Sequence, residues 1–356
     1  MYKLLIRPLL FCFDPEKVHH FTFSFIKFST RIPFVSSIIR AVYKVENKSL
    51  ERHLFGLTFK NPVGLAAGFD KDAEVPDALL RLGFGFTEVG SITPKPQAGN
   101  PKPRLFRLVE DKAVINRMGF NNGGAEAALK RLERRTGQPG VLGINIGANK
   151  DSHDRIEDYA IMTRAMVPHA SYLAVNISSP NTPGLRALQD EGALTELLDA
   201  VIAARSEVAD ASPPPIFLKV APDLEPADID AIARIALDKQ LGALIVSNTT
   251  ISRPELRSHH AGETGGLSGA PLKPLATQRV RDFRKATGGA IPLIGVGGIA
   301  SAEDAWERIK AGASLVQLYS AMVYEGPGLG ASIVRGLDRL MTQEGYSTIA
   351  EAVGTE

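Results

Sequence analysis

The chain of 356 residues is poor in the residue types on which disulfide-stabilised and metal-binding proteins depend. Its one cysteine, Cys12, excludes an internal disulfide and any iron–sulfur or zinc site that needs several cysteines. None of its seven histidines has the spacing of a zinc motif beside a carboxylate. We therefore expect a reducing compartment, no metal, and chemistry carried by other side chains.

Long apolar runs and a strong net charge are missing too. No stretch approaches the roughly 18 consecutive apolar residues of a transmembrane helix. No small-residue cleavage site follows the short apolar run 9–13, so a signal peptide is not expected. The net charge of +2 gives no indication of nucleic-acid binding. With 44% hydrophobic and 22% charged residues, the composition is that of an ordinary globular protein.

The first 48 residues differ from the rest in charge and aromatic content. They hold eight basic and three acidic side chains, a net charge of +5, and seven of the 16 phenylalanines fall within the first 34 residues. Asp14 and Pro15 suit the start of a helix, and the segment 31–33 suits its end. A basic, phenylalanine-rich leader on a mildly acidic body is typical of a surface that meets anionic lipid.

Inside this predicted helix, apolar side chains recur at helical spacing. Phe21, Phe25 and Phe28 form the stripe, and we expect Phe23 and Ile26 to widen it. Two interpretations are open: a helix packed onto its own domain, or a helical hairpin on a membrane surface. The charge bias and the phenylalanine density both favour the second. We therefore divide the chain into an amphipathic helical extension, residues 1–45, and a body, residues 46–356.

From residue 60 onward, short apolar runs alternate with helical periods. Near-continuous apolar strands separated by helices indicate a parallel sheet buried on both faces, and eight such units close a barrel. We predict an α/β fold, a (β/α)8 TIM barrel with the N-terminal helical extension; an open doubly wound sheet is the alternative, but no GxGxxG follows the first strand. The predicted strands are 62–67, 86–90, 141–147, 172–178, 216–220, 243–248, 293–296 and 315–319, with helices such as 155–167, 194–208, 227–239 and 302–311 between them.

Two of the intervals between strands are long. Residues 91–140 include a strand-like pair, 104–109 and 113–117, and residues 250–289 separate the sixth and seventh strands. We expect both intervals to be insertions at the functional end of the barrel.

Polar groups or glycines terminate every predicted strand. In a (β/α)8 barrel the catalytic groups lie at the C-terminal ends of the strands. Lys71 and Lys219 are the most informative, because strands disfavour lysine and burial of an unpaired ammonium is costly. Three predicted loops follow the last three strands, where barrels commonly bind phosphate: the glycine-rich 265–269 and 295–298, and 319–320. Glycines that serve only tight turns are the alternative. Lysines, amides and hydroxyls around one barrel mouth, without a metal cluster, suggest a flavin.

Four motifs resemble the dihydroorotate dehydrogenase family over essentially the whole chain. They are Asn61-Pro-Val-Gly-Leu-Ala-Ala-Gly-Phe-Asp-Lys71, Asn116-Arg-Met-Gly-Phe-Asn121, Asn176-Ile-Ser-Ser-Pro-Asn-Thr-Pro-Gly184 and Gly295-Val-Gly-Gly-Ile299. The leader, and serine rather than cysteine at position 179, resemble class 2, the quinone-linked membrane form. The resemblance implies one FMN per chain, oxidation of dihydroorotate to orotate in pyrimidine biosynthesis, and electron transfer to a ubiquinone-type membrane quinone.

The resemblance also implies roles for individual residues. Ser179 would be the catalytic base, with Thr182 starting a proton relay through water, and Arg107 and His19 would lie near the quinone tunnel. The implied FMN contacts are Ala67, Gly68, Phe69, Asp70, Lys71, Ser91, Asn145, Asn176, Lys219, Ser247, Gly269, Gly298, Tyr319 and Ser320. The implied substrate contacts are Lys71, Asn116, Arg117, Met118, Gly119, Phe120, Asn176, Asn181, Asn248 and Thr249.

Three other functions fit the sequence less well. A class 1 enzyme that uses fumarate or NAD and a dihydropyrimidine-type oxidoreductase are disfavoured by Ser179 and by the absence of cysteine clusters. A catalytically silent barrel that binds a membrane or a partner through its leader is disfavoured by the lysines, asparagines and glycine segments. The expected location is the cytoplasmic side of a bacterial cell membrane, as a peripheral protein, because no transit peptide is recognisable.

Overall fold

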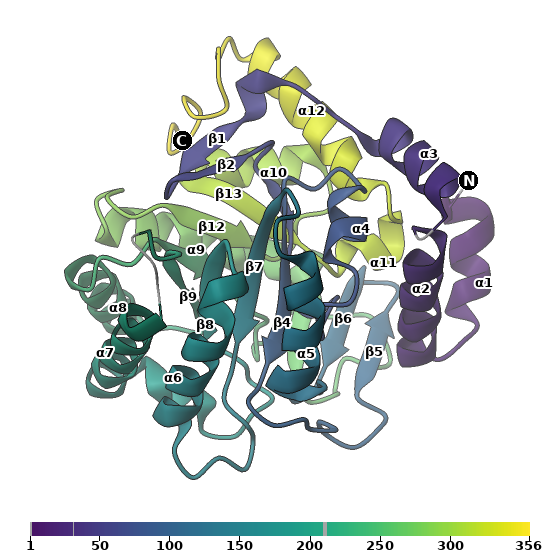
Figure 1. The fold of residues 1–356 in the computed structure, drawn as a ribbon. Coiled ribbons are helices and arrows are strands. Elements are labelled where there is room, and N and C mark those ends of the chain that lie inside the picture. The colour runs from purple at the N-terminus through teal and green to yellow at the C-terminus, as the bar shows by residue number, and fades with distance from the viewer. Residues whose placement is uncertain (1, 31, 209–211) are drawn as a thin grey trace.

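Eight parallel strands close into a barrel at the centre of the molecule (Figure 1). The computed structural model describes residues 2–30, 32–208 and 212–356. The barrel strands neighbour one another in chain order, so the predicted TIM barrel is confirmed, and the predicted ranges of the fifth and seventh strands agree with the structure at both ends. The strands are β3 (Val63–Leu65), β4 (Phe86–Ile92), β7 (Val141–Ile146), β8 (Tyr172–Asn176), β9 (Ile216–Val220), β10 (Ala243–Val246), β12 (Leu293–Val296) and β13 (Ala313–Leu318).

Helices cover the outside of the barrel, and their first residues explain where several of them begin. Asp154 caps α6 by accepting a hydrogen bond from the Glu157 amide, and Ser301 caps α10 in the same way from the Asp304 amide. The helices are α4 (Pro76–Leu80), α5 (Gly124–Leu132), α6 (Arg155–Met166), α7 (Glu191–Val208), α8 (Pro226–Asp238), α9 (Lys273–Ala286), α10 (Ala302–Lys310), α11 (Ala321–Glu325) and α12 (Leu329–Gln343), with short 3-10 turns at Lys48–Leu50, Glu133–Arg135, Val167–His169, Leu185–Gln189 and Ala270–Leu272.

An antiparallel hairpin, β1 (Arg52–Leu54) and β2 (Leu57–Phe59), closes the N-terminal end of the barrel. It packs on buried aromatic rings inside the barrel, among them Tyr172 and Phe217, which stack with their centroids 4.3 Å apart. Apolar packing thus fills this end, and the C-terminal ends of the strands are left for polar side chains.

The two long insertions meet in one three-stranded antiparallel sheet of β5 (Leu105–Leu108), β6 (Ala113–Asn116) and β11 (Gly266–Gly269). The segment 265–269 was expected to be a loop, and that expectation was wrong. Its glycines and serine have low strand propensity, but they permit a close approach that other residues would prevent. A Cβ on Gly266 would lie 1.9 Å from Oγ1 of Thr249, and one on Gly269 would lie 2.4 Å from the carbonyl oxygen of Lys112.

The N-terminal extension consists of a π-helical turn (Tyr2–Ile6), α1 (Arg7–Phe11), α2 (Pro15–Ser29) and α3 (Pro33–Tyr43), which lie along one side of the barrel (Figure 1). Asp14 caps α2 by accepting a hydrogen bond from the Lys17 amide at 2.9 Å, as predicted. The predicted end of the helix at 31–33 includes Arg31, which lies outside the described residues. No helix in the described ranges combines the length and the apolar character that a membrane span requires.

The apolar side chains of α2 lie on two faces instead of one widened stripe. Phe23 and Ile26 pack against the core of the barrel domain, whereas Phe21, Phe25 and Phe28 are 65%, 62% and 66% exposed. The expectation that Phe23 and Ile26 widen the exposed stripe was therefore wrong. Packing of the helix onto its own domain is confirmed for one face. The other face is uncovered, and its contact with a membrane surface stays a prediction.

Candidate active site

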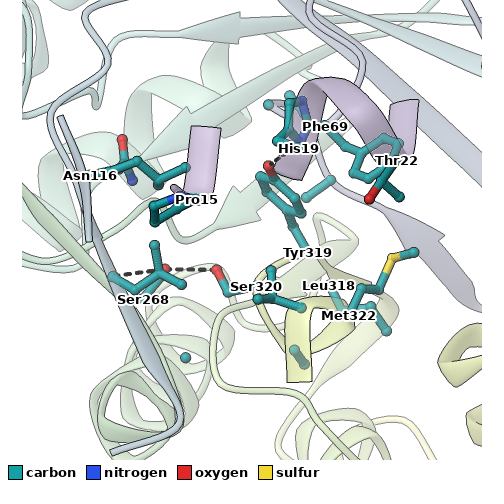
Figure 2. Close-up of a pocket in the computed structure, with 18 of the residues that line it drawn as sticks. Pro15, His19, Thr22, Phe69, Asn116, Ser268, Leu318, Tyr319, Ser320 and Met322 are labelled. Carbon is teal, nitrogen blue, oxygen red and sulfur yellow. Dashed lines mark hydrogen bonds between the residues drawn. The ribbon is translucent and has the colours of Figure 1, made fainter. Parts of the chain in front are cut away.

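One continuous cavity of about 690 Å³ opens at the C-terminal ends of the barrel strands. Its inner part is bordered by the strand ends and by the sheet of β5, β6 and β11, and its outer part runs between α2, α11 and the turn at Tyr2–Ile6. Figure 2 shows part of this cavity, where His19 of α2 points toward Tyr319. A polar chamber thus leads into an apolar arm walled by the N-terminal extension.

Most of the residues singled out in the sequence line this cavity. They are Ala67, Gly68, Phe69, Lys71, Ser91, Asn116, Met118, Gly119, Phe120, Asn176, Ser179, Asn181, Lys219, Ser247, Asn248, Thr249, Gly269, Gly298, Tyr319 and Ser320.

Three others have their side chains directed elsewhere. The buried carboxylate of Asp70 accepts hydrogen bonds from the Glu74 and Val75 amides, and burial raises its pKa to about 6. Asn145 lies behind the cavity wall, and Arg117 pairs with Glu263 at 2.6 Å.

A hydrogen-bonded network of amides and hydroxyls forms the floor of the chamber. Asn176 Nδ2 donates to Ser91 Oγ at 2.9 Å, and Asn176 Oδ1 accepts from Ser178 Oγ at 2.9 Å and from Asn248 Nδ2 at 3.3 Å. Across the chamber, Asn181 Nδ2 donates to Asn116 Oδ1 at 3.3 Å. Side chains fixed in this way present donors and acceptors in set directions, which suits a planar ligand with amide-like edges.

Two lysines supply positive charge to the chamber. Burial lowers the pKa of Lys71 to about 8 and also lowers the pKa of Lys219, an effect that the charge of Glu88 opposes. Lys219 is 6% exposed, and in the described ranges its ammonium has neither an ion pair nor a hydrogen bond. A buried ammonium in that condition is costly to the fold, and it would suit an anionic ligand in the chamber.

Glycines after the last strands line another part of the same cavity. Gly298 has φ +72°, and a Cβ there would lie 2.5 Å from Cα of Lys273. Beside it, the hydroxyls of Ser268 and Ser320 are 2.7 Å apart (Figure 2). Backbone amides and hydroxyls in a glycine-lined recess are a suitable set of donors for a phosphate group.

Ser179 follows the end of β8 and is 6% exposed, at the cavity wall. Its Oγ accepts a hydrogen bond from the Asn181 amide at 3.3 Å, which orients the hydroxyl. Three residues later, Thr182 is buried, and its Oγ1 has no hydrogen-bond partner among the described residues. A buried hydroxyl in this position needs a water or a ligand to satisfy it.

The apolar arm begins at His19, whose ring packs edge-on against Phe69 with centroids 5.3 Å apart. Its Nδ1 lies 3.5 Å from the hydroxyl of Tyr319 (Figure 2). Burial and the nearby charge of Lys71 lower the pKa of His19 to about 3, so the imidazole is neutral at pH 7. Arg107 borders the outer end of the arm and donates to the carbonyl of Leu10 at 3.2 Å.

Glu88 is a central residue that the sequence reasoning missed. It is 1% exposed and accepts hydrogen bonds from Asn145 at 2.8 Å, Tyr172 at 3.0 Å and Gln317 at 2.8 Å. The sequence did contain a sign of it, because Glu88 is a carboxylate in the middle of an apolar strand. A buried carboxylate requires hydrogen-bond donors around it. It holds Asn145, and through that residue the Ser91–Asn176 floor.

The comparisons with known proteins agree on one family. The family model described as "Dihydroorotate dehydrogenase" matches residues 49–341. "Dihydroorotate dehydrogenase (quinone)" from Erythrobacter litoralis is 67% identical over 99% of both chains, and the protein of the same name from Novosphingobium aromaticivorans is 64% identical, again over 99% of both. The crystal structure of DHODH from Eimeria tenella in complex with ferulenol has a TM-score of 0.90 at 40% identity and covers 96% of this chain and 95% of that one. The chain belongs to the dihydroorotate dehydrogenase family.

Proposed function

We propose that this protein oxidises (S)-dihydroorotate to orotate in de novo pyrimidine biosynthesis and passes the electrons through FMN to a membrane quinone. The observation that carries the proposal is the single cavity, in which a polar chamber with two lysines and an oriented serine continues into an apolar arm. A polar substrate and an apolar acceptor could use the two ends of one flavin site in turn. The names of the curated relatives support the same reaction.

The residues of the chamber fit FMN. Lys219 would stand by the isoalloxazine, where its charge favours the reduced, anionic form, and Gly298, Ser320 and Gly269 would hold the phosphate. FMN, when bound, supplies a hydride acceptor at its N5 position. Side chains at Gly298 or Gly269 would collide with backbone, so these glycines keep the recess open. Asp70 and Asn145 would support the site from behind the cavity wall.

Dihydroorotate would lie against the asparagines. Asn116, Asn176, Asn181 and Asn248 offer donors and acceptors to the ring edges, with Thr249 beside them, and Lys71 would offset the substrate carboxylate. The substrate must lose a proton from C5 as its C6 hydride leaves. Ser179 would take that proton and release its own through a water held by Thr182, because a hydroxyl is a poor base unless it passes a proton on.

The apolar arm would receive the quinone between α2 and α11, with His19, Tyr319 and Arg107 at its polar points. Around its opening lies an uncovered apolar surface that includes Phe28, Phe34 and Ile38. With the basic leader, this surface would seat residues 1–45 on anionic lipid at the cytoplasmic side of a bacterial cell membrane, and residues 46–356 would form the catalytic domain.

The test is to mix the purified holoprotein with dihydroorotate under anaerobic conditions and to monitor the absorbance of the flavin. Bleaching that a ubiquinone analogue restores, and that fumarate and NAD do not, is the expected result. Recovery with fumarate or NAD alone would keep the substrate and refute the quinone. A bound flavin that dihydroorotate does not bleach would refute the proposed reaction.

Replacement of Lys219 with methionine should lower FMN affinity at least ~10-fold while it raises the melting temperature of the apoprotein. The charge that favours the flavin is lost, but a buried unpaired ammonium is removed from the fold. Flavin content and thermal unfolding of the apoprotein measure the two effects. Lys239→Met, which removes an ion-paired lysine on the surface, is the control and should change neither. Unchanged FMN affinity in Lys219→Met would contradict the assigned role.

Orotate binding should weaken as the pH rises through about 8. The lowered pKa of Lys71 means that its ammonium is present below about 8 and is lost above it, well before an ordinary lysine would titrate. The dissociation constant for orotate, from flavin difference spectra, should then rise by up to ~10-fold per pH unit. Lys71→Met should bind orotate more weakly and without this pH dependence. The same dependence in both proteins would show that another group is responsible.

A further inference from the structure

A buried ion pair joins helix α2 to the insertion that borders the substrate chamber. Arg104 donates from Nη2 to Oε1 of Glu16 at 2.7 Å and from Nε to Oε2 at 3.2 Å, so both carboxylate oxygens are engaged. The side chains of Glu16 and Arg104 are each 7% exposed. Burial alone would raise the pKa of Glu16, but Arg104 and Lys102 lower it to about 2, so the carboxylate is charged throughout the physiological range.

The guanidinium of Arg104 also fixes the loop that precedes β5. Its Nη1 donates to the carbonyl of Ala98 at 2.6 Å and to the carbonyl of Asn100 at 2.8 Å. One side chain therefore binds α2 on one side and the 98–104 loop on the other. The two side chains have little freedom to move, because both charged groups are desolvated. Any displacement would break hydrogen bonds that the guanidinium of Arg104 makes.

Asn100 carries the connection to the loop of the catalytic serine. Its Nδ2 donates to the carbonyl of Asn181 at 3.2 Å and to the carbonyl of Arg117 at 3.0 Å. The amide of the same Asn181 donates to Ser179 Oγ. An unbroken series of contacts thus runs from α2, the wall of the apolar arm, to the hydroxyl at the substrate end of the chamber.

Attachment of the helix alone does not require this arrangement. A second ion pair, between Lys27 and Glu74, ties the other end of α2 to the barrel in a more exposed position, with side-chain exposures of 37% and 22%. No hydrogen bond in the described ranges connects Lys27 with the 98–104 loop or with the serine loop. The two pairs differ in burial and in what lies beyond them.

We propose that Glu16 and Arg104 are positioning residues that set the Ser179–Asn181 loop from helix α2, by way of Asn100. The proposal rests on the proposed function, since it assigns the loop to dihydroorotate and the helix to the quinone arm. The position of α2 against the barrel determines the affinity of the chamber for its ligand. Ligands in the two ends of the cavity then affect each other's affinity by one common factor, as linkage requires.

The experiment compares the holoproteins of the wild type, Glu16→Gln, Asn100→Ala and the control Lys27→Ala. Orotate affinity is measured from flavin difference spectra, and kcat and KM for dihydroorotate are measured with a water-soluble acceptor. We expect Glu16→Gln and Asn100→Ala each to raise the orotate dissociation constant and the KM about 10-fold at unchanged FMN content. A fifth protein, which combines Glu16→Gln with Asn100→Ala, should bind orotate no more weakly than either single variant, because both substitutions break the same link. Lys27→Ala should match the wild type.

Wild-type affinity in both Glu16→Gln and Asn100→Ala would overturn the proposal, as would effects that simply multiply in the double variant. Asn100→Ala removes no charge, so it keeps the test decisive if Glu16→Gln does not fold. Failure of the proposed function looks different. In that case the wild type itself would neither bind orotate nor be bleached by dihydroorotate.

Discussion

Replacement of Ser179 with alanine should slow reduction of the bound flavin by dihydroorotate at least ~100-fold, the usual range for the loss of a positioned base. The serine lies at the cavity wall, 6% exposed, and the Asn181 amide orients its hydroxyl. Among the described residues that line the cavity, His19 is the one histidine, and it lies beside Tyr319 in the apolar arm rather than in the chamber, so no histidine shares this role. Stopped-flow absorbance under anaerobic conditions measures the rate directly.

Two observations separate loss of a base from loss of the site. Ser179→Ala should keep its FMN and should bind orotate within a few-fold of the wild type, because the asparagines and Lys71 are intact. Ser179→Cys should recover part of the rate and reach its maximum at lower pH than the wild type, because a thiol ionises near pH 8.5, more readily than a hydroxyl. Flavin reduction by Ser179→Ala at a near-normal rate would refute the assignment.

The barrel could be predicted from the sequence because its strands are short, apolar on both faces and separated by helices. β9 and β12 begin and end where their apolar runs do. The apolar runs that predicted β8 and β10 are longer than the strands, and their last residues, 177–178 and 247–248, belong to the loops at the site. The cap at Asp14 was visible for a similar reason, since capping depends on residues three apart in the chain.

Contacts between distant segments could not be predicted in this way. The pairing of β11 with β6 joins residues about 150 apart, and nothing local in Gly266–Gly269 indicates a strand. The directions of the Asp70 and Asn145 side chains depend on the loop after β3 and on Glu88, which a motif does not describe. The two faces of α2 became distinct only when the barrel was in place to cover Phe23 and Ile26.

The uncovered face of the N-terminal extension leads to the second prediction with a large effect. Simultaneous replacement of Phe28, Phe34 and Ile38 with glutamine should reduce binding to anionic liposomes at least ~100-fold. The three side chains are 66%, 74% and 46% exposed, and none of them lines the cavity. Burial of a large apolar side chain in the lipid interface contributes roughly 2 kcal/mol, so three losses remove several powers of ten in partitioning. Flotation with vesicles that contain anionic lipid measures the change.

The kinetics of the same variant should distinguish the membrane from the active site. Turnover with a short-chain, water-soluble quinone should stay within about twofold of the wild type, since the chamber and the arm are unaltered. Turnover with a long-tailed quinone in vesicles should fall with the loss of binding, because the acceptor is confined to the bilayer. Ile161 and Leu237 are 42% and 37% exposed on α6 and α8, away from the extension, so their replacement with glutamine is the control and should leave flotation unchanged. If the triple variant floats like the wild type, residues other than Phe28, Phe34 and Ile38 attach the protein to lipid, and the proposed membrane surface is wrong.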